Sequence, residues 1–137
     1  PKVFFQRGTN IGEARFSPDG RWITYTSEES GRCEVYLAAF PGPGERFQIS
    51  PSGGGAPRWR RDGRELFYLA EDGALMAVEV RTAGAPEAGV PRKLLEPHPR
   101  ALDYDVAADG KRFLIVASGA ESSPPITLVQ NWTAGLK

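Results

Sequence analysis

Residues 14–25 read ARFSPDGRWITY, with an Asp-Gly pair between two apolar runs. Such a pair is the strongest short-range signal for a β-hairpin, because glycine tolerates positive φ and aspartate can hydrogen-bond its own backbone. The pattern recurs as PRWRRDGRELFY at residues 57–68 and as YDVAADGKRFLI at residues 104–115, so the turns lie 43 and then 47 residues apart. Each repeat is therefore predicted to open with a strand, a tight turn and a second strand. The predicted turn residues are Asp19 with Gly20, Asp62 with Gly63, and Asp109 with Gly110.

The rest of each repeat also favours strands, because it is rich in β-branched and aromatic residues and is broken by Gly, Pro and Ser. Third strands are predicted at residues 35–38, 75–80 and 126–130, and fourth strands at residues 46–50 and 92–95. Four short strands at this repeat period are typical of a β-propeller blade. The sequence thus predicts an all-β fold, a β-propeller segment of three four-stranded blades.

The repeats place the three blades at residues 13–50, 56–96 and 102–132, and the last of these lacks an outer strand. Residues 1–7 resemble the fourth strands and lie at the same distance from the next turn, so they are predicted to form an outer strand that completes a last blade. The whole chain is then a single half-propeller. An alternative is that it was excised from a longer propeller.

Closed propellers typically have four to eight blades, so three blades would leave apolar flanks and strand edges uncovered. Two copies would supply six blades and could form a symmetric closed ring. We therefore predict a homodimer in which the first strand of one chain completes the last blade of the other.

Composition excludes several classes of function. The chain has 17 Lys and Arg against 17 Asp and Glu, so it lacks the basic excess that binding to nucleic acid or to a membrane surface needs. It contains no apolar run of the length of a membrane span. One Cys and one His cannot form a zinc site of these ligands within one chain. No cofactor and no metal are expected.

Several charged residues near the start of each first strand are candidates for a ligand site. A propeller places such residues around its axis, where a small polar ligand could bind, although the charges could equally pair with one another. The candidates for this axial channel are Glu13, Arg15, Arg58, Asp103 and Asp105. The turn aspartates are interpreted as caps of their own turns rather than as acid–base groups or calcium ligands.

The turn SPDGR at residues 17–21, preceded by ARF at residues 14–16, resembles the WD-repeat-like blades of the TolB type. This resemblance implies a propeller and favours a periplasmic or other extracytoplasmic location. The ending at residues 126–137 is similar to the last blade of propellers in bacterial sensor proteins, including membrane serine/threonine kinases, although the chain contains no kinase motif.

The function predicted from these observations is a non-enzymatic binding or scaffold module whose partner is itself, with a protein or a small polar ligand as a further candidate. Two alternatives remain open. The chain could be the gating or sensor part of a larger enzyme, such as a peptidase of the prolyl-oligopeptidase type or a receptor kinase. It could also be a lectin-like sugar binder.

Overall fold

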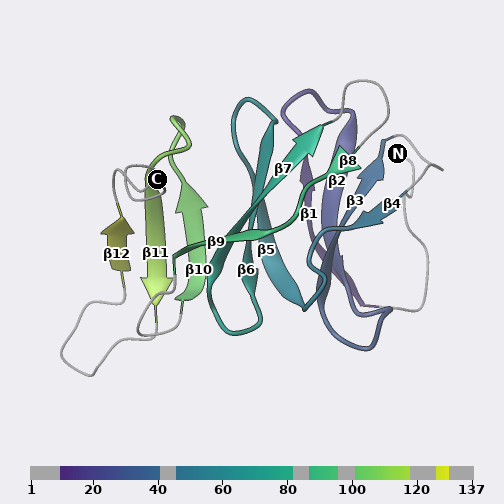
Figure 1. Cartoon of the computed structure of the whole chain (residues 1–137), viewed down its shortest axis with the longest axis horizontal. Coiled ribbons are helices and arrows are strands. Elements are labelled where there is room, and N and C mark those ends of the chain that lie inside the picture. The colour runs from purple at the N-terminus through teal and green to yellow at the C-terminus, as the bar shows by residue number, and fades with distance from the viewer. Residues whose placement is uncertain (1–9, 41–45, 82–86, 96–100, 118–125, 130–137) are drawn as a thin grey trace.

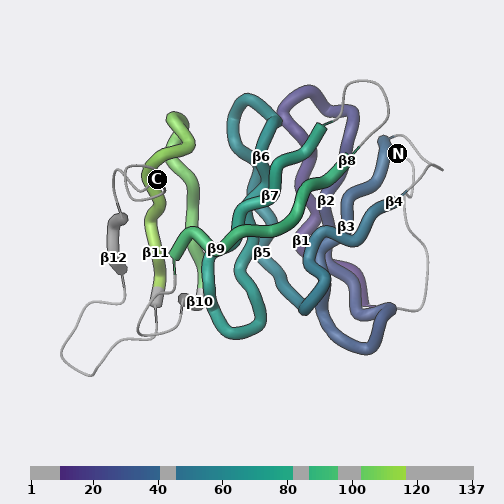
Figure 2. Tube along the Cα trace, in the orientation of Figure 1, coloured from purple at the N-terminus to yellow at the C-terminus, as the bar shows by residue number. Residues whose placement is uncertain are grey.

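The computed structural model describes residues 10–40, 46–81, 87–95, 101–117 and 126–129. All regular structure in these ranges is β-strand, and the strands form antiparallel sheets that stand side by side (Figure 1). The chain passes through the sheets in sequence order (Figure 2). The described residues include no helix of the length and hydropathy needed to cross a bilayer.

Each sheet begins with its predicted hairpin. Sheet 1 has the strand order β1 (Ile11–Phe16), β2 (Trp22–Ser27), β3 (Glu34–Ala39) and β4 (Arg46–Gln48). Sheet 2 contains β5 (Gly54–Trp59), β6 (Glu65–Ala70) and β7 (Leu75–Arg81), with β8 (Glu87–Ala88) and β9 (Arg92–Leu95) both paired to β7. Sheet 3 contains β10 (Ala101–Val106), β11 (Phe113–Ala117) and β12 (Ile126–Val129).

Two outer strands differ from the prediction. Strand β4 ends at Gln48 rather than at residue 50, because the next two amides both donate to the Val35 carbonyl, at 2.7 and 3.4 Å, and leave the regular ladder. Strand β8 was not predicted. It pairs with the end of β7 and is separated from β9 by Pro91, which has no N–H to continue a ladder. The predicted outer strand at residues 1–7, and the end of the last repeat after Val129, lie outside the described residues.

The middle strands are buried on both faces. All six residues of β2 are buried, as are the first five of β6, so these strands read as continuous runs rather than as an apolar–polar alternation. Alternate side chains contribute to different cores. The core between sheets 1 and 2 contains Trp22, Val35, Leu37, Ile49, Leu66, Tyr68, Val78 and Val80. The core between sheets 2 and 3 contains Phe67, Leu69, Leu75, Ala77, Leu94, Tyr104, Phe113 and Ile115.

The first strand of each sheet contains a bulge. The register shifts between Gly12 and Arg15 in β1 and between Gly55 and Arg58 in β5. Inside these bulges Glu13 has φ 49° and Ala56 has φ 52°, both in the left-handed region that non-glycine residues rarely adopt. In β10 the shift lies nearer the start of the strand, between Ala101 and Asp103. The bulges bend the first strands where these lie beside one another.

The outer flanks of the molecule are covered to different degrees. On the flank of sheet 1 that faces away from sheet 2, a cluster of Ile23, Tyr25, Tyr36 and Ala38 is buried within the chain, so the expectation of a bare flank does not hold for these residues. Phe16 on the same flank is 59% exposed, and Leu114 in sheet 3 is 41% exposed. Among the described residues, Phe16 and Leu114 are thus exposed apolar side chains on the two flanks, and Val90 between β8 and β9 is exposed as well.

Candidate functional site

The turn aspartates bond to their own turns. In each hairpin the aspartate Oδ1 accepts the backbone N–H of the residue two places later, at 2.9 to 3.0 Å. The glycine that follows each aspartate has φ between 70° and 74°, which a side chain would strain. The first turn has an added contact, because the Ser17 hydroxyl donates to Asp19 Oδ1 at 2.6 Å. These contacts engage one carboxylate oxygen of each aspartate in closing its turn.

The contacts of the first turn predict an acid dependence. The Ser17 hydroxyl, followed by the Arg21 N–H, lowers the pKa of Asp19 below its usual 3.8. The ionised form is favoured in the fold, so its contribution to stability is complete above the usual pKa and is lost as the pH falls through the lowered value. We expect Ser17→Ala to raise the pKa of Asp19 toward 3.8 in an NMR titration of its carboxyl carbon. Asp109 serves as the control, because Ala107 stands where the first turn has Ser17; an Asp19 pKa that does not move would contradict this account.

The bulge of β5 is held from both neighbouring sheets. Glu13 Oε2 accepts the Ala56 N–H at 2.6 Å from the side of sheet 1, and the Tyr104 hydroxyl donates to the Ala56 carbonyl at 2.7 Å from the side of sheet 3. A left-handed backbone costs a non-glycine residue about 1–2 kcal/mol. Two hydrogen bonds of about 0.5–1.5 kcal/mol each are enough to offset that cost. The backbone of Ala56 in sheet 2 is thus hydrogen-bonded to both neighbouring sheets.

The remaining candidate residues form weaker contacts. Arg58 Nη2 lies 3.6 Å from Asp103 Oδ1, and the Arg58 guanidinium lies 5.8 Å from the centre of the Tyr104 ring. Burial raises the pKa of the Tyr104 hydroxyl well above its usual value. Arg15 donates to the adjacent Ala14 carbonyl, and Asp105 accepts the adjacent Val106 N–H. Asp103 is the exposed partner of this ion pair, and pairs at the surface contribute about 0–1 kcal/mol, so the hydrogen bonds to Ala56 are the firmer link between sheets.

The sequence interpretation identified Glu13, Arg58 and Asp103, which do lie between sheets, but it missed Ala56 and Tyr104. No local signal marks Ala56, because its importance lies in its backbone. Tyr104 occupies the position that Ala14 and Pro57 hold in the other repeats. A polar aromatic residue at a position that is otherwise small and apolar was the one available clue.

A cavity of about 760 Å³ opens between sheets 1 and 2, beside Glu13. Its walls are the starts of β1 and β5 and the ends of β2 and β6. The backbone of Gly54 and Gly55 lines one side, and the polar residues around it are Asn10, Glu13, Glu28, Arg32 and Glu71. Asn10 donates to Glu28 at 2.6 Å. A space of this size with several hydrogen-bonding groups suits a small polar ligand or a protein loop.

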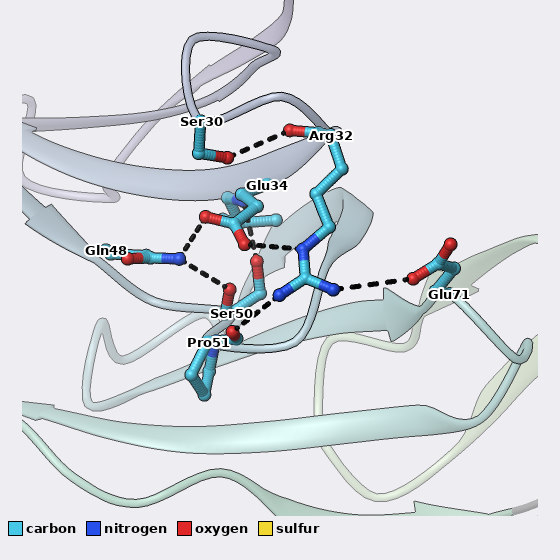
Figure 3. Close-up of polar contacts among 8 residues, drawn as sticks. Ser30, Arg32, Glu34, Gln48, Ser50, Pro51 and Glu71 are labelled. Atoms are coloured by element: carbon cyan, nitrogen blue, oxygen red, sulfur yellow. Dashed lines mark hydrogen bonds and ion pairs between the residues drawn. The ribbon is translucent and has the colours of Figure 1, made fainter.

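Arg32 connects the rim of this cavity to the interior of sheet 1 (Figure 3). Its Nε lies 3.1 Å from Oε1 of the buried Glu34, and Gln48 donates to the other Glu34 oxygen. Nη2 donates to the Pro51 carbonyl at 3.3 Å, and Nη1 lies 4.0 Å from Glu71 of sheet 2. One guanidinium therefore touches sheet 1, the connection to sheet 2 and the end of β6. Within the described ranges no group of three His, Cys, Asp or Glu residues is placed to hold a metal ion.

The described part of the chain forms three antiparallel sheets that stand side by side with their first strands adjacent, which is the arrangement of a β-propeller fold. Solved structures of propeller proteins share it. Oligogalacturonate lyase from Vibrio parahaemolyticus is similar with a TM-score of 0.60 and 14% identity, over 85% of this chain and 33% of that one. TolB from Acinetobacter baumannii is similar with a TM-score of 0.50 and 20% identity, over 96% of this chain and 43% of that one.

The acylaminoacyl peptidase of Pyrococcus horikoshii is also similar, with a TM-score of 0.55 and 14% identity, over 84% of this chain and 18% of that one. The chain thus spans less than half the length of each of these proteins. No protein-family model and no curated protein sequence matches it. At these identities the likeness is one of fold.

Proposed function

We propose that this chain is a non-enzymatic binding and scaffold module that closes a six-bladed propeller ring with a second copy of itself. The proposal rests on one observation: the charged side chains of Glu13 and Arg58 contact residues of the neighbouring sheet. Glu13 binds a backbone N–H of the next sheet, and Arg58 contacts Asp103 and the ring of Tyr104. Groups that bridge neighbouring sheets act as structural links, which is what a scaffold requires.

The same contacts argue against a catalytic use of these residues. A general acid or base must lie within hydrogen-bonding reach of a substrate proton. One carboxylate oxygen of Glu13 is instead 2.6 Å from the Ala56 amide, and the buried Tyr104 hydroxyl is bonded to the Ala56 carbonyl. The activities named for the lyase and the peptidase belong to those proteins, and their likeness to this chain supports a shared fold.

The sugar-binding alternative is disfavoured by the tryptophans of the described residues. A lectin of this type would need exposed aromatic rings on which a sugar can stack. Trp22 is only 8% exposed and belongs to the core between sheets 1 and 2, and Trp59 packs against the same core. Both rings therefore serve packing between sheets rather than recognition at a surface.

The cavity beside Glu13 is the surface that the module would offer to a small polar ligand or a loop of a partner protein. Its carboxylates, amide and guanidinium provide both acceptors and donors. We place the module outside the cytoplasm, in the periplasm or beyond it, on the basis of the resemblance to TolB-type blades.

The assembly part of this proposal is tested by the mass of the particle in solution. We expect sedimentation equilibrium at micromolar concentration to give roughly twice the chain mass of 14.9 kDa, with dissociation on dilution as mass action requires. In the proposed ring, two copies would suffice because each contributes the three sheets that its described residues form. A particle that keeps the mass of one chain up to the highest soluble concentration would overturn the proposed ring.

A further inference from the structure

The two interfaces within the chain are built alike at the turn end of the sheets. A side-chain carbon added to Gly63 would lie 3.6 Å from the Pro18 ring, so the turn of sheet 1 covers the turn of sheet 2. A carbon added to Gly110 would lie 3.1 Å from the Arg60 side chain, so the turn of sheet 2 covers the turn of sheet 3. In both cases the covering residue stands one or two places before the turn aspartate of the preceding sheet.

The corresponding position in sheet 1 is open. A carbon added to Gly20 would meet nothing within 4 Å, and Gly20 itself is exposed whereas Gly110 is buried. Phe16 shows the same contrast, because its counterparts Trp59 and Val106 pack against the cores between sheets. Phe16 is 59% exposed and touches the edge of the Phe40 ring at a centroid distance of 5.0 Å. We name Phe16 and Gly20 the open corner.

The opposite flank of the chain has a matching uncovered surface. Leu114 in sheet 3 occupies the repeat position of Phe67, which is 1% exposed because sheet 3 covers it. Leu114 is 41% exposed, and Ala108 in the preceding turn is exposed as well. Sheet 3 therefore has a covering turn and an apolar residue but no following sheet among the described residues. The two incomplete surfaces lie at opposite ends of the row of sheets (Figure 1).

We propose that the open corner of one copy receives the turn at Ala107 and Ala108, together with Leu114, from a second copy. This inference rests on the proposed ring and assigns its contact surface. The occupant is a second copy because the chain already uses this kind of contact twice: in each interface, a residue one or two places before the turn aspartate of one sheet covers the turn glycine of the next sheet. If the two copies are related by a twofold axis, each fills the open corner of the other. No such surface is then left free to add further copies.

The contact predicts how single substitutions act on assembly. We expect Phe16→Ser and Leu114→Ser each to raise the dissociation constant of the dimer at least tenfold in analytical ultracentrifugation, because each removes an apolar side chain from both contacts. Val90→Ser is the matched control, since Val90 is 88% exposed, lies between β8 and β9 of sheet 2 and belongs to neither surface. Its dissociation constant should equal that of the unmodified chain.

A mixture of the two variants gives a sharper test. A dimer of one Phe16→Ser copy and one Leu114→Ser copy retains one contact in which both Phe16 and Leu114 are present. The mixture should therefore associate more tightly than either variant alone, a result that general loss of folding cannot produce. A mixture no tighter than its components, or variants that dimerise like the unmodified chain, would overturn the assigned contact and leave the ring itself standing. An unmodified chain that stays monomeric would overturn both.

Discussion

Replacing Phe67 with alanine should lower the free energy of unfolding by about 3–5 kcal/mol, the largest loss that we expect from any single substitution in this chain. Phe67 is 1% exposed and lies in the middle of the core between sheets 2 and 3. Its ring meets the edge of Phe113 at a centroid distance of 5.1 Å and an interplanar angle of 82°. The substitution removes this aromatic contact and leaves a cavity between two sheets whose described strands share no β-ladder.

Equilibrium unfolding in urea measures this loss, and two further variants define its cause. Phe67→Leu keeps most of the side-chain volume and should cost less than about 1.5 kcal/mol. Val90→Ala removes exposed apolar surface and should change stability by no more than about 0.5 kcal/mol. If Phe67→Ala cost no more than Val90→Ala, the core between sheets 2 and 3 could not be what holds these sheets together.

The hairpins and the repeat period could be predicted because their causes are local. An Asp-Gly pair between apolar runs defines a turn within a few residues, and the aspartate bonds observed in all three turns span only two positions. The middle strands followed from their apolar composition, and β9 was predicted with its observed bounds. The bulges at Glu13 and Ala56 could not be predicted, because neither position is a glycine, the residue that usually marks a positive φ.

The links between sheets depend on parts of the chain that are distant in sequence. The bond from Glu13 to Ala56 spans 43 residues, and the bond from Tyr104 to Ala56 spans 48. Glu13 and Ala56 occupy equivalent positions in their repeats. The Glu13 side chain reaches the Ala56 backbone only because of how sheets 1 and 2 are placed relative to each other. The two-residue strand β8 was missed because Glu87 and Ala88 have no strand preference of their own.

Replacing Gly54 with alanine should also destabilise the fold, by about 1–3 kcal/mol, because the added carbon would be overpacked. That carbon would lie 2.7 Å from Cδ2 of Tyr68 and 3.1 Å from the carbonyl oxygen of Leu69. The oxygen belongs to the β-ladder and the Tyr68 ring is buried between sheets 1 and 2, where desolvation raises the pKa of its hydroxyl to about 12. Neither neighbour can move aside without disturbing packing or pairing.

The adjacent Gly55 offers a matched control for this prediction. A carbon on Gly55 would meet only Glu13 Oε2 at 3.4 Å and Thr26 Cγ2 at 4.0 Å, both at the ends of side chains. Gly55→Ala should therefore be neutral, or stabilising by up to about 1 kcal/mol through the reduced freedom of the unfolded chain. Both changes replace one glycine and add one methyl group to the same strand. A difference between the two melting temperatures therefore reports the room around the added methyl group rather than the loss of a glycine. Equal melting temperatures would mean that β5 does not approach Tyr68 closely, and that the wall of the cavity beside Glu13 is looser than its geometry indicates.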